Sequence, residues 1–479
     1  MRIHDQLNRN VRDFTPVHAG KVGMYVCGLT VQGPPHIGHL RAVVVGDVMR
    51  RYLTHRGFDV TLVHNFTDVE DKIIDKAVAE GVDFRVVAER NMAAYEEASL
   101  KLGAIPPTVA PRVTDHMPEI LDMIRELVDK GHAYESNGDV YFSVESFPRY
   151  GRLSGRRVEE LRAGSRIEVG EQKRAPEDFA LWKAAKPGEP AWPSPWSPGR
   201  PGWHIECSAM AIRYLGQILD LHGGGMDLVF PHHENEIAQS EAITGKPFAN
   251  HWVQHGLVNL GGEKMSKSTG HFFLASDVFK EVDPGVVRYY LMTTHYRSPI
   301  EFSRERLSEA ESAHRKLRNF LADAAFARAD GGSGAAGGAG SSSSGHPAAE
   351  RAIASADTVF HASMDEDFNT ARALAALFEL VRELGRLRSE EGAGGPAFQV
   401  SMARAGDTLV RLGSVLGISG LEGDGETQAV DDPAERLRAE RDQARASKDW
   451  ARADAIRGQL QALGWAVEDH AEGSRLKRL

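Results

Sequence analysis

The chain has 479 residues, a formal net charge of −10 and 42% hydrophobic residues. At roughly 150 residues per domain this length predicts two to four domains, and the acidic balance argues against a protein that coats nucleic acid non-specifically. No apolar run reaches the ~18 residues that a membrane-spanning helix needs, and the N-terminus lacks the apolar core of a signal peptide. We therefore expect a cytoplasmic protein without a membrane segment.

The N-terminal part follows a strand–helix–strand pattern. Residues 22–27 and 59–64 are typical of strands, and 40–55 carry the apolar periodicity of a helix that Gly57 is expected to end. This order predicts a βαβ crossover and hence a parallel sheet. The strand pattern returns in two later segments, 218–222 and 252–260.

Three other stretches differ from this part in composition and in apolar pattern. Residues 112–200 are rich in turns and are interpreted as an insertion in the sheet domain. From 305 to 425 the pattern is helical, apart from an almost pure Gly, Ala and Ser stretch at 331–345 that predicts a flexible loop. The tail, 433–479, is more basic than the acidic remainder of the chain.

A first motif that carries chemistry, Pro35-His36-Ile37-Gly38-His39, lies between the first strand and its helix. The N-terminus of a helix favours phosphate through its free N–H groups and its dipole. Gly38 allows close approach of a nucleotide, and His36 and His39 can donate hydrogen bonds to phosphate oxygens. The alternative is a turn with two incidental histidines.

A second motif, Lys264-Met265-Ser266-Lys267-Ser268, is flanked by glycines. Its two lysines on a loop that can close suit a departing pyrophosphate, although a solvated basic loop is the alternative. Together the two motifs resemble the signatures of the class I aminoacyl-tRNA synthetases. The resemblance implies a Rossmann-like nucleotide-binding domain and attack of an amino-acid carboxylate on the α-phosphate of ATP.

A third group combines the chain's two cysteines, Cys27 and Cys207, with a His-rich segment. His232 and His233 lie four and three residues before Glu236, so spacing alone does not choose between the histidines. Two thiolates, one imidazole and one carboxylate would make a tetrahedral zinc site. Taken singly, Cys27 also suits a buried strand, and the histidines suit a helix cap.

The sequence around these positions resembles the cysteinyl-tRNA synthetases, in the segments 24–28, 202–210 and 230–236 and over nearly the whole chain. The resemblance selects His232 and implies one Zn²⁺ per chain, held by Cys27, Cys207, His232 and Glu236. It implies an enzyme that activates L-cysteine with ATP and Mg²⁺ and transfers cysteine to the terminal adenosine of tRNA(Cys). Zinc would select the substrate thiol over the hydroxyl of serine.

The same resemblance implies roles for further residues. The expected catalytic residues are His36, His39, Lys264 and Lys267. ATP contacts are expected from His36, Gly38, His39, Lys264, Met265, Ser266, Lys267 and Ser268. Thr67, Trp203, His222 and Asp227 match positions that line the amino-acid site, where Asp227 would pair with the substrate ammonium. Core packing is the alternative for Trp203.

The implied architecture is α/β, with a Rossmann-like parallel-sheet catalytic domain over 1–304. This domain contains a connective insertion at about 112–200 and the lysine-loop region at about 251–304. An α-helical bundle over 305–425, with its flexible loop at 331–345, precedes a small C-terminal anticodon-side domain at 433–479. The family also implies a monomer.

Two alternatives change the function. Cysteine ligases of the mycothiol pathway resemble these synthetases but transfer activated cysteine to an amino sugar. They lack a developed anticodon-side region, so the basic tail with Arg475, Lys477 and Arg478 favours tRNA. The other alternative is a catalytically inactive RNA-binding relative, against which the intact motifs and ligand candidates argue.

Overall fold

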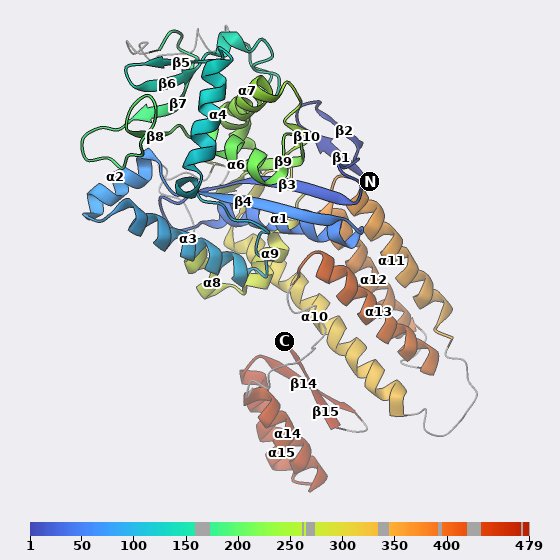
Figure 1. Ribbon diagram of the computed structural model, residues 1–479. Coiled ribbons are helices and arrows are strands. Elements are labelled where there is room, and N and C mark those ends of the chain that lie inside the picture. Colours follow the sequence, from blue (N-terminus) through green and yellow to red (C-terminus); the bar gives the residue numbers. More distant parts are fainter. Residues whose placement is uncertain are drawn as a thin grey trace. The chain divides into compact units, whose positions relative to one another are not determined.

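The computed structural model describes residues 1–158, 173–260, 263–264, 274–333, 344–390, 395–418, 433–470 and 473–478. The chain folds into two compact units (Figure 1). Unit 1 comprises Met1–Leu307 and Ala362–Ala371, and unit 2 comprises Ser308–His361 and Arg372–Leu479. The chain therefore enters unit 2, returns to unit 1 for one short segment, and then enters unit 2 again.

A four-stranded parallel sheet with the order β10–β9–β3–β4 forms the centre of unit 1. Its strands are β3 (Lys21–Thr30), β4 (Asp59–Thr67), β9 (Leu219–Gly225) and β10 (Ala249–His255). β9 is buried along its whole length, as expected for a strand covered on both faces. The parallel sheet predicted from the sequence is confirmed. Its chain order reverses between β3 and β9, and α/β proteins bind ligands at the carboxyl ends of such strands.

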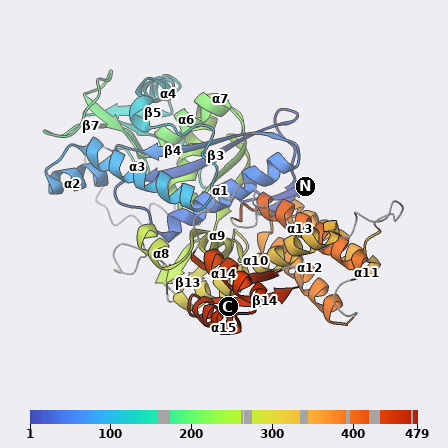
Figure 2. The same ribbon diagram turned by 90° about the horizontal axis from the view of Figure 1, so that it is seen from below.

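Helix α1 (Ile37–His55) joins β3 to β4 and lies on one side of this strand pair, whereas α6 (Ile205–Leu215) lies on the other (Figures 1 and 2). A capping box begins α1. Nδ1 of His36 accepts from the Gly38 amide at 3.2 Å, and Nδ1 of His39 accepts from the His36 amide at 3.2 Å. Gly57 follows the helix with a φ of 88°, which favours glycine and confirms the predicted end.

Two buried arginines anchor α1 within unit 1. Arg41, on α1 itself, donates to the carbonyl oxygens of Leu257, His295, Tyr296 and Ser298. Arg288, on α9 (Pro284–Met292), donates to Asp47 of α1 at 2.5 Å. Arg41 and Arg288 are 1% and 0% exposed. Because burial lowers the pKa of Arg41 only to about 10, this group remains charged at neutral pH.

An antiparallel sheet with the order β5–β6–β7–β8 separates β4 from β9 in the sequence. Its strands are β5 (Ala133–Ser136), β6 (Asp139–Phe142), β7 (Phe179–Ala184) and β8 (Gly199–Pro201). Three helices precede it in the chain: α2 (Asp71–Glu80), α3 (Phe84–Lys101) and α4 (Met117–Asp129). The antiparallel sheet occupies the region predicted as an insertion, except for the last residue of β8.

Short elements complete unit 1. β11 (Val258–Leu260) pairs in parallel with β13 (Ile300–Phe302) and antiparallel with β12 (Glu263–Lys264). The predicted strand at 252–260 is therefore two strands, the end of β10 and all of β11. Further elements of unit 1 are β1 (Arg2–Asp5), β2 (Asn10–Asp13) and α8 (Ala275–Glu281).

Unit 2 is helical over most of its length. α10 (Arg304–Ser333) leads into it, followed by α11 (Pro347–Asp365), α12 (Thr370–Glu390) and α13 (Pro396–Val415). The predicted flexible loop begins at 331, but α10 continues through Ser333. Residues 334–343 of that loop lie outside the described residues.

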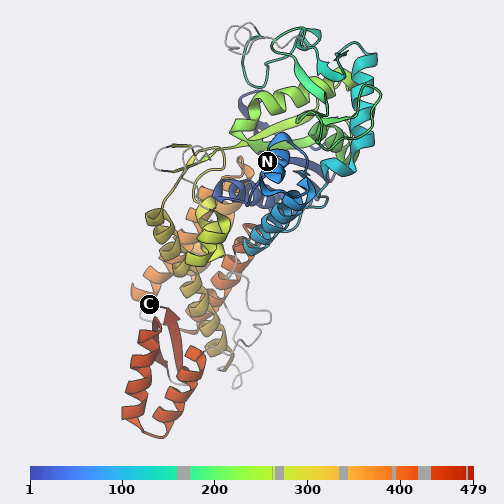
Figure 3. The same ribbon diagram turned by 90° about the vertical axis from the view of Figure 1, so that its left-hand side faces the viewer.

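The last part of unit 2 contains α14 (Pro433–Ala446), α15 (Trp450–Ala462) and a hairpin of β14 (Trp465–His470) with β15 (Gly473–Arg478) (Figure 3). Ala434, Ile456, Leu460 and Val467 form its small buried core. Arg441 pairs with Asp469 at 2.6 Å and so ties α14 to β14. The hairpin was not predicted from the sequence.

None of the helices in the described part of the chain combines the length and the apolar character that crossing a bilayer requires.

The Asp47–Arg288 pair allows a test of how α1 is held. We expect Asp47→Ala to lower the free energy of unfolding by about 3–5 kcal/mol, because it leaves the fully buried Arg288 without its carboxylate. Urea denaturation followed by circular dichroism measures this change. Asp122→Ala is the matched control: Asp122 pairs with Arg125 on the surface, so its loss should cost less than about 1 kcal/mol. Equal costs for the two variants would contradict the anchoring role.

Candidate metal centre and nucleotide site

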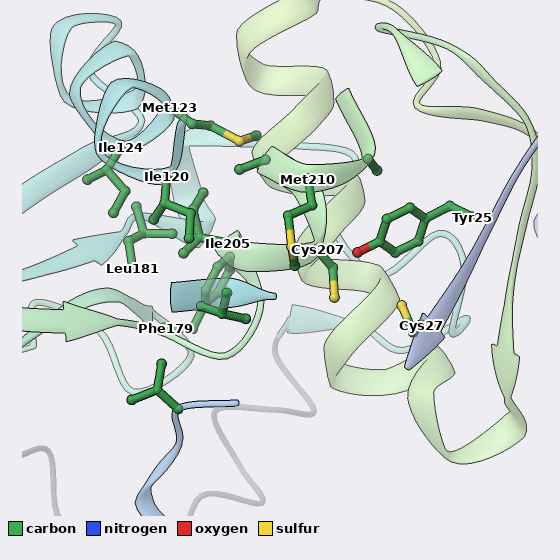
Figure 4. Packing of buried hydrophobic residues seen from close by; sticks show 14 of the residues in the cluster. Tyr25, Cys27, Ile120, Met123, Ile124, Phe179, Leu181, Ile205, Cys207 and Met210 are labelled. Carbon is green, nitrogen blue, oxygen red and sulfur yellow. The ribbon is translucent and has the colours of Figure 1, made fainter. Parts of the chain in front are cut away.

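Four side chains from separate segments meet in unit 1. They are Cys27 of β3, Cys207 of α6, His232 of η4 (Val229–His233) and Glu236 of α7 (Glu234–Thr244). Their ligand atoms all lie within 4.8 Å of one another. Sγ of Cys27 and Nε2 of His232 lie 3.4 and 3.1 Å from the same carboxylate oxygen of Glu236. Figure 4 shows the two sulfur atoms close together, with the hydroxyl of Tyr25 directed toward them.

All four side chains are buried, at 7% exposure for Cys27 and 2% or less for the others. Burial opposes ionisation of Glu236, but the imidazoles of His222 and His232 hold the pKa of its carboxyl well below the usual value. Burial also opposes ionisation of Cys207, yet the hydrogen bond from Cys27 and the charge of His232 lower its pKa to about 6. Burial and the neighbouring Cys207 instead raise the pKa of Cys27. Against the effect of burial, Glu236 and Cys207 raise the pKa of His232 to about 10. The ionised acids Glu236 and Cys207 thus face the imidazolium of His232 in the interior.

This donor set fits a divalent cation that accepts sulfur, nitrogen and oxygen ligands together. Zinc takes such sets in tetrahedral sites, whereas Mg²⁺ and Ca²⁺ prefer oxygen ligands alone. Because an unpaired anion is costly in a buried site, a bound cation would also compensate the charge of Glu236. The four residues could therefore hold a metal ion, and their donor set is consistent with zinc.

A second group of ligand atoms overlaps the first. Cys27, His222, His233 and Glu236 also lie within 4.8 Å of one another. Nε2 of His222 lies 2.7 Å from the second carboxylate oxygen of Glu236. Nδ1 of His233 donates to the amide oxygen of Gln254 at 2.9 Å, in the amide orientation that satisfies both groups. The group that includes both cysteines contains His232, whereas His233 belongs to the other.

Sequence reasoning missed three buried residues around the cluster. His204 lies with its Nδ1 3.0 Å from Nδ1 of His232, which would orient the imidazole while Nε2 faces the other ligands. Glu206 accepts a hydrogen bond from Thr67 at 2.5 Å. Asn65 accepts from the Gly28 amide at 2.9 Å, and Sγ of Cys207 lies 3.8 Å from the same oxygen. The only signal in the sequence was their adjacency to residues already singled out.

The predicted amino-acid site residues lie around this cluster. The ring of Trp203 is centred 4.6 Å from that of His232 and is 40% exposed, so core packing does not explain this residue. His222 is fully buried and stacks on Trp252, with ring centroids 4.4 Å apart. Asp227 is exposed and follows the carboxyl end of β9. Thr67 ends β4.

Three glycines near the site lie so close to other atoms of the protein that a side chain would meet them. A Cβ on Gly28 would lie 1.5 Å from the carbonyl oxygen of Asn65. A Cβ on Gly224 would lie 2.9 Å from the ring of His233, and one on Gly225 would lie 2.4 Å from a carboxylate oxygen of Asp227. The backbone of Asn65 therefore requires glycine at position 28, whereas the close atoms at positions 224 and 225 belong to side chains.

The structure describes the first nucleotide motif in full and the second only in part. The rings of His36 and His39 stack at the N-terminus of α1, with centroids 3.5 Å apart. Both Nδ1 atoms are engaged in the capping box. Lys264 ends β12, and only its backbone is described. Met265, Ser266, Lys267 and Ser268 lie outside the described residues.

Three families of known sequences match consecutive parts of the chain. "tRNA synthetases class I (C) catalytic domain" matches residues 13–312, "DALR domain" matches 359–421, and "Cysteinyl-tRNA ligase anticodon binding domain" matches 427–475. The first match alone covers more than half of the chain. The match at the C-terminus includes α14, α15 and most of the β14–β15 hairpin.

Individual relatives match over their full length. A protein of Geobacter metallireducens named cysteine–tRNA ligase is 47% identical over 488 residues, covering 100% of this chain and 99% of that protein. A protein of Heliobacterium modesticaldum with the same name is 47% identical over 483 residues, covering 100% and 99%.

Solved structures agree in fold. Methionyl-tRNA synthetase of Mycobacterium tuberculosis, in complex with methionyl-adenylate, aligns with a TM-score of 0.66 at 16% identity, over 84% of this chain and 91% of that chain. A putative arginyl-tRNA synthetase of Campylobacter jejuni aligns with a TM-score of 0.58 at 13% identity, over 85% and 94%. At such low identity these likenesses concern the fold alone. The full-length matches decide the family: the chain belongs to the cysteine–tRNA ligases, which are class I aminoacyl-tRNA synthetases.

Proposed function

We propose that this cysteine–tRNA ligase holds one Zn²⁺ between Cys27, Cys207, His232 and Glu236. Bound there, zinc would supply a soft Lewis acid that prefers a substrate thiolate to a neutral hydroxyl. The observation that carries the proposal is the convergence of these four buried ligand atoms within 4.8 Å. His204 and His222 act through the ligands, since they contact His232 and Glu236 at 3.0 and 2.7 Å.

We further propose that Thr67, Trp203, His222 and Asp227 form the amino-acid site. Trp203 would cover the substrate side chain next to the metal, because its exposed ring lies against His232. Asp227 would receive the substrate ammonium, because its carboxylate is exposed at the carboxyl end of β9. Thr67 would be held in place by Glu206, and His222 would join the site through Glu236.

The adenylation step follows from the two motifs. An oxygen of the cysteine carboxylate attacks the α-phosphorus of ATP, and the bond from that phosphorus to the pyrophosphate oxygen breaks. His36, Gly38 and His39 would stabilise the α-phosphate at the N-terminus of α1. Lys264 and Lys267, within the ATP contacts Lys264–Ser268, would stabilise the leaving pyrophosphate together with Mg²⁺. A terminal adenosine hydroxyl of tRNA(Cys) then attacks the carbonyl carbon and releases AMP.

We infer that the enzyme works as a monomer in the cytoplasm. The four proposed ligands and the four residues of the amino-acid site all belong to unit 1, so the proposed site needs no second chain. Both cysteines are free thiols within the metal cluster, which suits a reducing compartment. Charging of tRNA also takes place where translation consumes the product.

Cysteine-dependent exchange of pyrophosphate into ATP, measured with tRNA(Cys) charging on one zinc-quantified sample, tests the function. We expect both activities and about one zinc per chain. Exchange without charging would support an amino-sugar acceptor. Zinc-loaded protein without exchange would contradict the proposed chemistry.

Replacing one proposed ligand tests the zinc site. We expect Glu236→Gln to weaken zinc binding by at least about 100-fold, because Glu236 is a proposed ligand. Loss of a residue that only orients a ligand typically weakens metal binding by roughly 10- to 100-fold. Competition with a chelator measures the affinity, and exchange with serine in place of cysteine measures the loss of selectivity. Ser240→Ala is the matched control, one turn further along α7. Its buried hydroxyl has no partner among the described residues, so its removal should leave both readouts unchanged.

The role of the lysine loop is tested separately. We expect Lys267→Ala to lower the rate of adenylation by about 100- to 1,000-fold, since a preorganised charge on the leaving group is lost. Zinc content should not change. Lys280→Ala removes an exposed lysine on α8 that pairs with Asp277, and it should leave the rate unchanged. A normal rate in Lys267→Ala would overturn the assignment.

A further inference from the structure

A cavity of about 310 Å³ lies in unit 1, away from the metal cluster. Its walls come from α1, β3, β4, α3 and the segment 104–110. Strand alternation separates it from the cluster. Val26 lines the cavity while the next residue, Cys27, belongs to the cluster. His64 and Phe66 line it, whereas Asn65 and Thr67 contact Cys207 and Glu206. The cavity and the metal cluster therefore lie on opposite faces of the same two strands.

The walls are mostly apolar, and most of their polar atoms are already paired. Tyr95 hydrogen-bonds through its hydroxyl to Nε2 of His64 at 2.8 Å, and the two rings stack 5.7 Å apart. The Ser99 hydroxyl donates to the carbonyl of Tyr95 at 2.8 Å. Asp47 accepts from Arg51, Arg288 and the amide of Ile105. Few groups remain to hold water inside the cavity.

One ring nitrogen of a cavity-lining histidine takes part in none of these hydrogen bonds. Nδ1 of His64 has no partner within the part of the chain that the structure describes, and the residue lines the cavity. Burial lowers the pKa of His64 to about 4, so the imidazole is neutral at pH 7. A neutral imidazole offers a single donor or acceptor to a ligand. The carboxylates of the wall are Asp47, which is paired with arginines, and Glu96, which is exposed to solvent. An anionic ligand would therefore lose its hydration here without a counter-charge.

We propose that this cavity is a second small-molecule site, which binds an uncharged aromatic ligand of two fused rings through one hydrogen bond to His64. The volume sets the size: a buried apolar cavity of about 150 Å³ holds one benzene ring, and this cavity is about twice as large. Phe66 and Tyr95 supply aromatic walls. Leu100 and Ile105, which are 59% and 41% exposed, line the way in.

Indazole is a suitable probe because it is neutral and carries both a donor and an acceptor nitrogen. Saturation-transfer NMR on the full-length protein should show saturable binding, with a Kd on the order of 0.1–1 mM for nine non-hydrogen atoms. Saturating cysteine and a non-hydrolysable ATP analogue should not displace it. Absence of saturable binding, or displacement by either substrate, would overturn the proposal.

Filling the cavity provides a matched pair of variants. Ser99→Phe should weaken indazole binding by at least about 10-fold, because the new ring occupies the space. Ser99→Ala removes the same hydroxyl but leaves the cavity open, and it should bind indazole as the unsubstituted protein does. Pyrophosphate exchange reports that both variants are folded. Equal binding by the two variants would place indazole elsewhere.

His64→Phe tests the hydrogen bond and remains informative if Ser99→Phe does not fold. This variant keeps a ring opposite Tyr95 but removes Nδ1, together with Nε2, the hydrogen-bond partner of the Tyr95 hydroxyl. Benzothiophene binding controls for that second loss. We expect indazole binding to weaken by about 5- to 10-fold, while binding of benzothiophene, which has no N–H group, stays within about 2-fold. Equal losses for the two probes would mean that His64 only shapes the cavity and would overturn its role as the hydrogen-bonding group.

Discussion

The carboxylate of Glu236 has no exposed surface, yet His222, His232 and Cys27 all direct polar atoms at it from 2.7 to 3.4 Å. A carboxylate in such a place remains ionised only if its neighbours compensate the charge. Two imidazoles do so here, and a bound cation would do so more completely. The positions of β3, β9, η4 and α7 are all constrained by this requirement, because each contributes a side chain to it.

The backbone segments around the cluster are closely packed. Gly28 lies so close to the carbonyl oxygen of Asn65 that no side chain fits, and the Asn65 amide group in turn binds the Gly28 backbone. β3 and β4 are thereby held together next to Cys27. Because their side chains alternate between two faces, a displacement of either strand would affect the cluster and the cavity behind it together.

Helix α1 connects this region to the nucleotide motif. His36 caps its N-terminus and His39 lies in its first turn. Arg41 and Asp47 lie further along it, and their carbonyl contacts and ion pairs are buried. Arg41 binds the carbonyl of Leu257, one residue before β11, the strand that pairs with β12 and Lys264. One helix thus carries the first motif and contacts the chain segment that leads to the second.

Much of this enzyme was predictable from the sequence because the relevant signals are local. Apolar periodicity indicated the parallel sheet and α1. The motifs around His36 and His39, and around His232, His233 and Glu236, indicated the chemistry through their resemblance to the synthetase families. The β14–β15 hairpin was missed because its residues lack a clear alternation and carry several charges. The start of the flexible loop was placed too early, since glycines at 331 and 332 continue α10.

The sequence by itself therefore determined the fold class, the family and the candidate ligands. Only the tertiary structure decided which ligand atoms lie within 4.8 Å of one another. It grouped both cysteines with His232 rather than with His233. It alone brought in His204, Asn65 and Glu206, and it alone revealed the cavity lined by His64. These features depend on distances between side chains far apart in the chain. Periodicity and motif spacing carry no information about such distances, because they describe only neighbours along one helix or strand.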